Sequence, residues 1–137
     1  MFDRIFQDYE GSVTEIACLK VSKLKAILTP ENNNEVILIW IGTNSDSDWY
    51  RIFIDGWYCG IDHYKKDLSN EDIDEDVICI DYDWINDEIV ISAKVELGNK
   101  LLGDSSILLT IEFLSRKKLL LYCNDSDGVC KIELVSP

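Results

Sequence analysis

The stretch Glu88–Leu97, EIVISAKVEL, decides the fold class of this chain. From its second residue onward, apolar side chains recur at every second position and polar or charged side chains separate most of them. The apolar set is Ile89, Ile91, Ala93, Val95 and Leu97, and the polar set is Glu88, Ser92, Lys94 and Glu96. A period of two is typical of a strand with one buried and one solvated face. The stretch therefore predicts a half-buried antiparallel strand whose apolar set faces the core.

Segments on both sides of this stretch also have strand character. Trp49–Ile54, Asp55-Gly56 and Trp57–Ile61 predict a β-hairpin, because Asp-Gly tolerates the positive φ angles of a type I′ turn. Glu35–Ile41 is apolar on both faces, which predicts a central strand covered on both sides. Further strands are predicted at 77–84, with Ile78, Ile80, Tyr82 and Trp84 on one face, and at 107–113, 118–123 and 129–135.

Residues 13–28 fit two conformations. Ser12 and Glu15 have the spacing of a helix capping box. An apolar set then falls on one helical face: Val13, Ile16, Ala17, Val21, Leu24 and Leu28. The second half of the segment also fits an extended chain, so we favour a helix that breaks into a strand near Leu24.

The number and spacing of these segments predict the architecture. About eight short strands separated by turns indicate an antiparallel β-sandwich or a strongly bent sheet. We expect a mainly β fold with at most one N-terminal helix. With 137 residues the chain is long enough for one core and too short for two, so residues 1–137 are expected to form one domain.

Charge is the strongest compositional feature. Twenty-six acidic against thirteen basic residues give a net charge of −13. Such a chain repels phosphate backbones and anionic membranes, so we expect it to bind neither. No apolar run approaches the roughly 20 residues of a membrane helix, and the N-terminus lacks the pattern of a secretory signal. We therefore expect a soluble cytoplasmic protein, either a monomer or a weak dimer.

The acidic residues are concentrated in 62–88. The first part of this stretch, 62–76, is expected to be a polar connection in which a short helix can form at 68–73. This stretch has eleven acidic residues against two lysines, a net charge of −9. Tyrosines and tryptophans lie within it or just before it. Rings beside carboxylates are typical of protein-binding surfaces, although a solvated acidic face over core aromatics is the alternative. The predicted partner-binding residues are Asp62, Tyr64, Asp67, Glu71, Asp72, Asp74, Glu75, Asp76, Asp81 and Asp83.

Motifs for catalysis or metal binding are weak in this chain. The five cysteines form no C-x-x-C pair, which predicts free thiols, with a Cys123–Cys130 disulfide as the alternative. The run Asp72–Asp76 resembles the start of a calcium loop but lacks its glycine and its bidentate glutamate. His63, the one histidine, is expected at the surface. We expect no catalytic residue, no metal and no cofactor.

The chain resembles the immunity proteins of bacterial polymorphic toxin systems, including contact-dependent growth inhibition. The resemblance rests on a small acidic domain without a signal segment and on the acid cluster SNEDIDEDVICIDYDW at 69–84. Four tryptophans add to it: Trp40, Trp49, Trp57 and Trp84. It implies a cytoplasmic protein that binds a cognate toxin domain, often a basic nuclease, and blocks its active site or substrate approach. The alternatives are a small-molecule-binding β-barrel or sandwich domain, and a hydrolase that uses paired carboxylates.

Overall fold

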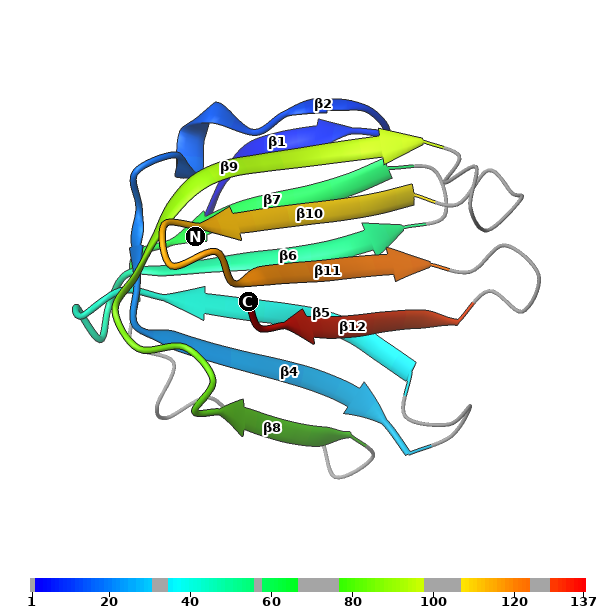
Figure 1. Ribbon diagram of the computed structural model, residues 1–137. Coiled ribbons are helices and arrows are strands. Elements are labelled where there is room, and N and C mark those ends of the chain that lie inside the picture. The colour runs from blue at the N-terminus through cyan, green and yellow to red at the C-terminus, as the bar shows by residue number, and fades with distance from the viewer. Residues whose placement is uncertain (1, 31–34, 56–57, 67–76, 98–106, 124–128) are drawn as a thin grey trace.

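The computed structural model describes residues 2–30, 35–55, 58–66, 77–97, 107–123 and 129–137, and shows a sandwich of two antiparallel sheets (Figure 1). Sheet A has the order β1-β7-β6-β5-β4-β8. Its strands are β1 (Phe2–Asp8), β7 (Tyr58–Tyr64), β6 (Trp49–Asp55), β5 (Glu35–Gly42), β4 (Lys23–Thr29) and β8 (Ile78–Tyr82). The predicted antiparallel sandwich is confirmed.

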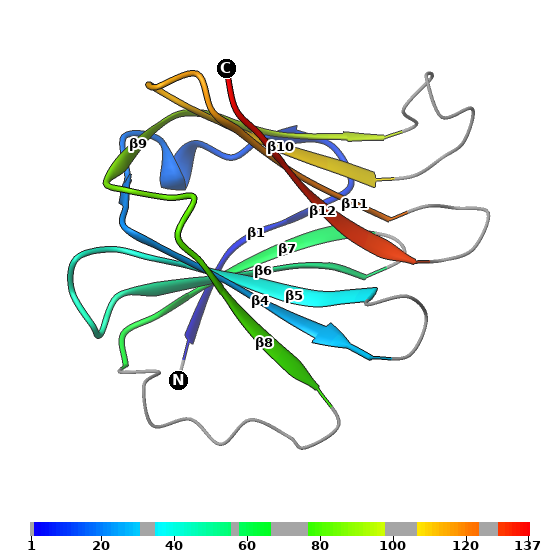
Figure 2. The same cartoon turned by 60° about the horizontal axis from the view of Figure 1, so that its bottom comes forward.

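Sheet B has the order β12-β11-β10-β9-β2, and β3 pairs with β9 outside this path. Its strands are β12 (Cys130–Val135), β11 (Lys118–Cys123), β10 (Ile107–Phe113), β9 (Glu88–Leu97), β2 (Gly11–Ser12) and β3 (Lys20–Val21). Figure 2 shows the two sheets as separate layers, and β8 is the edge strand of sheet A. The described residues thus form twelve strands, more than the eight expected.

The core lies between the sheets and follows the period of two. All four inward residues of β10, from Ile107 to Phe113, are buried, and Phe113 is the largest fully buried side chain. β5 supplies Ile39 and Ile41 from the opposite sheet. β5 has two strands on one side and three on the other, which confirms its predicted central position. The prediction that both of its faces are covered is wrong at Ile37, which is 44% exposed. Burial of these aliphatic side chains is the main term that favours folding.

The helix predicted within residues 13–28 is wrong. The segment forms one turn of 3-10 helix, η1 (Thr14–Ile16), and then β3 and β4. No side chain caps η1, so Ser12 and Glu15 are not a capping box. Residues four apart, such as Leu24 and Leu28, share a face in a strand as well as in a helix. Pairing of β4 with β5 and β8 decides between the two, and the strand expected near Leu24 is confirmed.

The predicted hairpin is confirmed as β6–β7, with two corrections. Asp55 pairs with Tyr58, so Asp55 belongs to the strand and not to the turn. β7 continues to Tyr64, so Asp62 lies inside the sheet and not in the polar connection expected to start there. The short helix considered at 68–73 lies outside the described residues.

β9 contains a β-bulge where it pairs with β10. Ser92 pairs with Glu112, and the next pair is Val90 with Phe113, so Ile91 has no partner on β10. One extra residue on one strand of an antiparallel pair defines a bulge. Because side chains alternate between faces, the extra residue reverses the alternation on its N-terminal side.

The bulge changes which side chains of β9 reach the core. Val90, Ala93 and Val95 are buried, whereas Ile89 and Ile91 are exposed. The prediction that Ile89 and Ile91 face the core is therefore wrong. Leu97, at the other end of the predicted apolar set, is 45% exposed as well, so only Ala93 and Val95 of that set are buried. The pattern in the sequence is regular, but the pairing with β10 is not.

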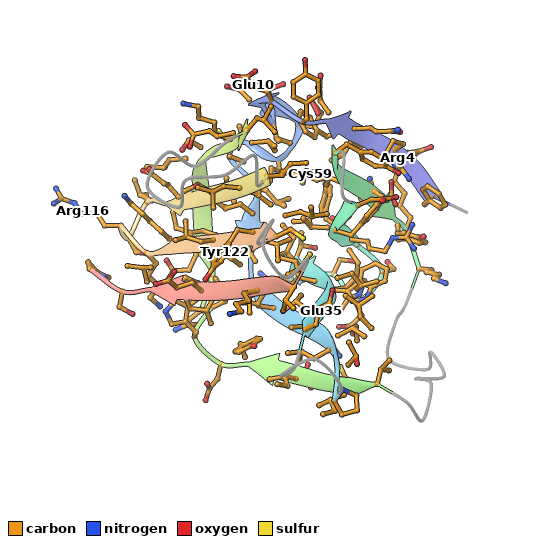
Figure 3. All side chains as sticks on the ribbon, turned by 90° about the vertical axis from the view of Figure 1, so that its right-hand side faces the viewer. Arg4, Glu10, Glu35, Cys59, Arg116 and Tyr122 are labelled. Atoms are coloured by element: carbon orange, nitrogen blue, oxygen red, sulfur yellow. The ribbon has the colours of Figure 1, made fainter. Side chains whose placement is uncertain are left out.

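All five cysteines are free thiols, as predicted. Cys123 and Cys130 are opposite each other on β11 and β12, and they are not joined by a disulfide. Cys18 is exposed, whereas Cys59 is fully buried between the sheets (Figure 3). Burial raises the pKa of Cys59 to about 12.

The rate of alkylation is expected to distinguish Cys18 from Cys59. At about pH 8, the raised pKa makes the thiolate of Cys59 about a thousandfold rarer than that of an ordinary thiol. Iodoacetamide should therefore label Cys18 first, and label Cys59 only after denaturant unfolds the chain. Mass spectrometry of peptides over time measures both rates, and Cys18→Ser is the control that removes the fast phase. Equal labelling rates in the folded chain would contradict the burial of Cys59.

Candidate functional site

The ten predicted partner-binding residues fall into three groups. Six lie outside the described residues: Asp67, Glu71, Asp72, Asp74, Glu75 and Asp76. Asp62 and Tyr64 are buried on β7. Asp81 on β8 and Asp83 just after it are exposed. Among the described members of the set, only Asp81 and Asp83 have a carboxylate that is exposed to solvent.

Asp62 is the one buried charged side chain in the described part of the chain. Its Oδ1 accepts a hydrogen bond from Arg4 Nε, and its Oδ2 accepts one from Arg51 Nη2 at 2.6 Å. Both arginines are register partners of Asp62, so the three side chains form one row across β1, β7 and β6. Burial of the Arg4 guanidinium lowers its pKa, but the hydrogen bond and charge of Asp62 outweigh this and raise it overall. The Asp62 carboxylate therefore forms its ion pairs within the fold, with Arg4 and Arg51.

Aromatic rings surround this row on the outer face of sheet A, where Figure 3 shows Arg4. The guanidinium carbon of Arg51 lies 5.3 Å from the ring centre of Phe2, 5.5 Å from Phe53 and 5.2 Å from Tyr64. Such cation–π contacts favour the charged guanidinium. Tyr64 also packs with Trp40 and Trp49 in a second, smaller apolar cluster. Tyr64 thus has a packing role on this face.

An open cleft of about 440 Å³ lies where β4 begins and β8 ends. Six of its lining residues carry the chemistry: Lys23, Lys25, Asp46, Trp49, Asp81 and Asp83. They come from β4, β6, β8, the 43–48 loop and the turn after β8. Leu24, Tyr82 and Ile85 also line the cleft, so these charged groups share it with apolar side chains.

Two lysines of the cleft each form an ion pair and also lie close to the ring of Trp49. Lys23 Nζ lies 2.6 Å from Asp46 Oδ1, and Lys25 Nζ lies 3.3 Å from Asp81 Oδ1. The two ammonium groups are 5.2 and 5.5 Å from the Trp49 ring centre. Both aspartates are largely exposed, and exposed ion pairs of this kind contribute only about 0–1 kcal/mol. Either ion pair can therefore be broken at little cost.

Asp83 is the carboxylate of the cleft that makes no ion pair with another described residue. It opens the turn at 83–87, and Asp87 at the end of that turn has a φ of 52°. Asp87 Oδ1 lies 2.6 Å from Ser22 Oγ, which itself lines the cleft. Lys117 Nζ donates a hydrogen bond to the Trp84 carbonyl at 2.6 Å. The turn that carries Asp83 is thus fixed by two hydrogen bonds, one from Lys117 to Trp84 and one between Ser22 and Asp87.

His63 does not lie at the surface, contrary to the prediction. It is half-buried, and its Nε2 is hydrogen-bonded to Asp48 Oδ1 in the 43–48 loop. Its ring stacks on Tyr50, with 4.4 Å between ring centres. Burial and the charge of Asp48 raise the pKa of Tyr50. These contacts attach the loop that carries Asp46 to the sheet.

In the part of the chain that the structure describes, no three His, Cys, Asp or Glu side chains are grouped so that they could hold a metal ion. No helix in the described ranges has the length and apolarity to span a bilayer. Protein-family models, curated proteins and solved structures were compared with this chain, and none of them matches it.

Proposed function

We propose that this chain is a protein-binding inhibitor that covers a basic partner domain, as an immunity protein covers a nuclease-type toxin. The observation that carries the proposal is the cleft with its exposed aspartates around Trp49. Asp81 and Asp83 were predicted from the sequence to bind such a partner, and Asp46 adds a third carboxylate from another element. Exposed carboxylates grouped in one cleft are suited to Lys and Arg side chains of a partner.

The distribution of charge supports a steering role. The described residues hold sixteen acidic and twelve basic side chains, a net charge of −4. The remaining residues hold ten acidic and one basic side chain, a net charge of −9. The strands themselves are therefore close to balanced, while the chain as a whole keeps a strong negative field. Such a field accelerates encounter with a basic partner and repels nucleic acid.

Inhibition follows from competition for the partner's cationic groups. A nuclease binds phosphates with Lys and Arg side chains. If one of these side chains enters the cleft, it pairs with Asp83 and displaces Lys25 from Asp81. The same cation is then unavailable to a phosphate, so the substrate cannot approach.

The proposal predicts that the cleft aspartates control the rate of association. The probe is the toxin domain that the proposed function places in a neighbouring gene. We expect Asp81→Asn/Asp83→Asn to bind this domain about tenfold more slowly than the unchanged protein at low salt. The difference should shrink as salt screens the charges. Stopped-flow mixing with a catalytically inactive toxin domain measures the rate, and survival of cells that co-express the active toxin measures protection.

The matched control is Asp55→Asn/Glu133→Gln, which removes the same charge from exposed residues away from the cleft. Equal association rates for the two double variants would show that the cleft does not guide binding. Absence of both binding and protection with the unchanged protein would overturn the proposed function itself.

A further inference from the structure

Three large aliphatic side chains form an exposed patch at the beginning of β9. Ile89, Ile91 and Leu114 are 38%, 52% and 64% exposed. The Leu114 amide donates a hydrogen bond to the Ile89 carbonyl at 2.8 Å, so the two residues are neighbours. Ile89 and Leu114 line a groove of about 310 Å³ together with Asp87, Glu88 and Ser115, and Ile91 lies two residues further along β9. Contiguous aliphatic surface with a polar rim is typical of protein interaction sites.

The bulge explains why Ile91 joins the exposed residues of the patch. Without Ile91, the order Val90, Ser92, Ala93 would alternate regularly between core and solvent. Ile91 therefore adds no buried side chain to the core. Its insertion exposes one more isoleucine to solvent. Bulges of this kind often re-aim side chains beside functional sites.

The patch and the cleft occupy the same end of the sandwich, on the left in Figure 1, where β8 and β10 end and β9 begins. The patch is on the outer face of sheet B and the cleft lysines are on the outer face of sheet A, so a partner that contacts both must cover this end. The 83–87 turn joins them along the chain. Asp87 lines the groove and accepts a hydrogen bond from Ser22, which lines the cleft. An apolar centre next to separate acidic groups has the composition of a protein interface with its polar rim.

We propose that Ile89, Ile91 and Leu114 are the apolar anchor of the partner interface, with the acidic cleft as its rim. The inference rests on the proposed function and adds the chemistry of the partner surface. The partner is a protein whose surface has an apolar hollow beside a cluster of Lys and Arg side chains. Charge complementarity selects this occupant, because a second copy of the chain and an anionic membrane would both be repelled by a net charge of −13.

The anchor and the rim should act on different rate constants. Apolar contacts in the centre of an interface form after encounter, so their loss mainly accelerates dissociation. Charged groups at the rim act on encounter, so their loss mainly slows association. The expected effect of removing the anchor is about a hundredfold weaker binding with an unchanged salt dependence.

The test compares Ile91→Ser/Leu114→Ser with the unchanged protein, using the inactive toxin domain as the probe. The matched control is Ile37→Ser/Leu97→Ser, which removes the same two residue types at 44% and 45% exposure from other places on the fold. We expect about hundredfold faster dissociation for the first variant and less than a threefold change for the control. Urea denaturation verifies folding, and the single Leu114→Ser variant carries the test if the double variant is destabilised.

Each outcome has a separate meaning. If the unchanged protein binds and the anchor variant dissociates no faster than the control, the anchor is wrong and the proposed function stands. If the unchanged protein does not bind the toxin domain, both proposals fail. If sedimentation shows that the unchanged chain dimerises and Ile91→Ser/Leu114→Ser does not, the occupant is a second copy and the inference is overturned.

Discussion

Asp62→Asn is expected to lower the free energy of unfolding by about 3 kcal/mol. The fully buried carboxylate of Asp62 accepts hydrogen bonds from Arg4 and Arg51. Asparagine retains the shape but not the charge, so two neighbouring guanidinium groups lose their counter-ion and repel each other. Urea denaturation measures the change. Asp81→Asn is the matched control, because Asp81 is exposed and its pair with Lys25 should contribute about 0–1 kcal/mol.

A triple variant distinguishes the contribution of charge to stability from that of packing in the row formed by Arg4, Asp62 and Arg51. Arg4→Met/Asp62→Leu/Arg51→Met replaces all three groups with apolar side chains of similar size. Buried ion networks replaced in this way often keep or gain stability. We expect the triple variant to recover most of the loss seen in Asp62→Asn. Equal instability of the two variants would show that the row is required for its shape and not for its charge balance.

Phe113→Ala is expected to cost about 3–5 kcal/mol of unfolding free energy. Phe113 is fully buried between the sheets. Its ring meets Trp84 edge to face, with 6.0 Å between ring centres. Alanine leaves a cavity in the core and removes the support of the 83–87 turn, so the turn that carries Asp83 should loosen as well. Chemical denaturation measures the first effect, and hydrogen exchange of the turn amides measures the second.

The neighbouring residue provides the control for Phe113. Leu114 follows it in the chain but is mostly exposed, so Leu114→Ala should change stability by no more than about 0.5 kcal/mol. Similar losses in the two variants would mean that the end of β10 is not packed as described. The contrast also shows that the patch can be changed without unfolding the protein.

The strands were predictable because their burial pattern is local. In β10 every second residue is apolar and every one of these is buried, so the sequence alone determines the inward face. In β9 the same reasoning fails at Ile91. Whether a residue pairs or bulges depends on the register of the neighbouring strand, and no feature of 88–97 records it.

The role of Asp62 could not be predicted from its neighbours. It belongs to an acid-rich run, and its partner Arg4 is 58 residues away in the sequence. One local signal was available: in Tyr58–Tyr64, Cys59 and Ile61 alternate with Gly60 and Asp62, which is a strand pattern. The polar composition of the residues that follow concealed this pattern.

The cleft was predictable only in part. Asp81 and Asp83 were identified from the density of acids, and both are exposed beside the cleft. Asp46, Lys23 and Lys25 were not identified, because they come from other elements and their own stretches have no unusual composition. Sites assembled from several strands and loops are defined by topology, which single-sequence patterns do not contain.

The positions of the two termini have a practical consequence for binding experiments. The hydroxyl of Ser136 accepts a hydrogen bond from Trp84 Nε1 at 3.1 Å, so the last residues lie against the turn that carries Asp83. Phe2 pairs with Tyr64, which pairs in turn with Trp49 of the cleft. A purification tag or a fluorescent fusion at either terminus would therefore emerge beside the proposed contact surface and obstruct it. Affinities should be measured after such additions have been cleaved off.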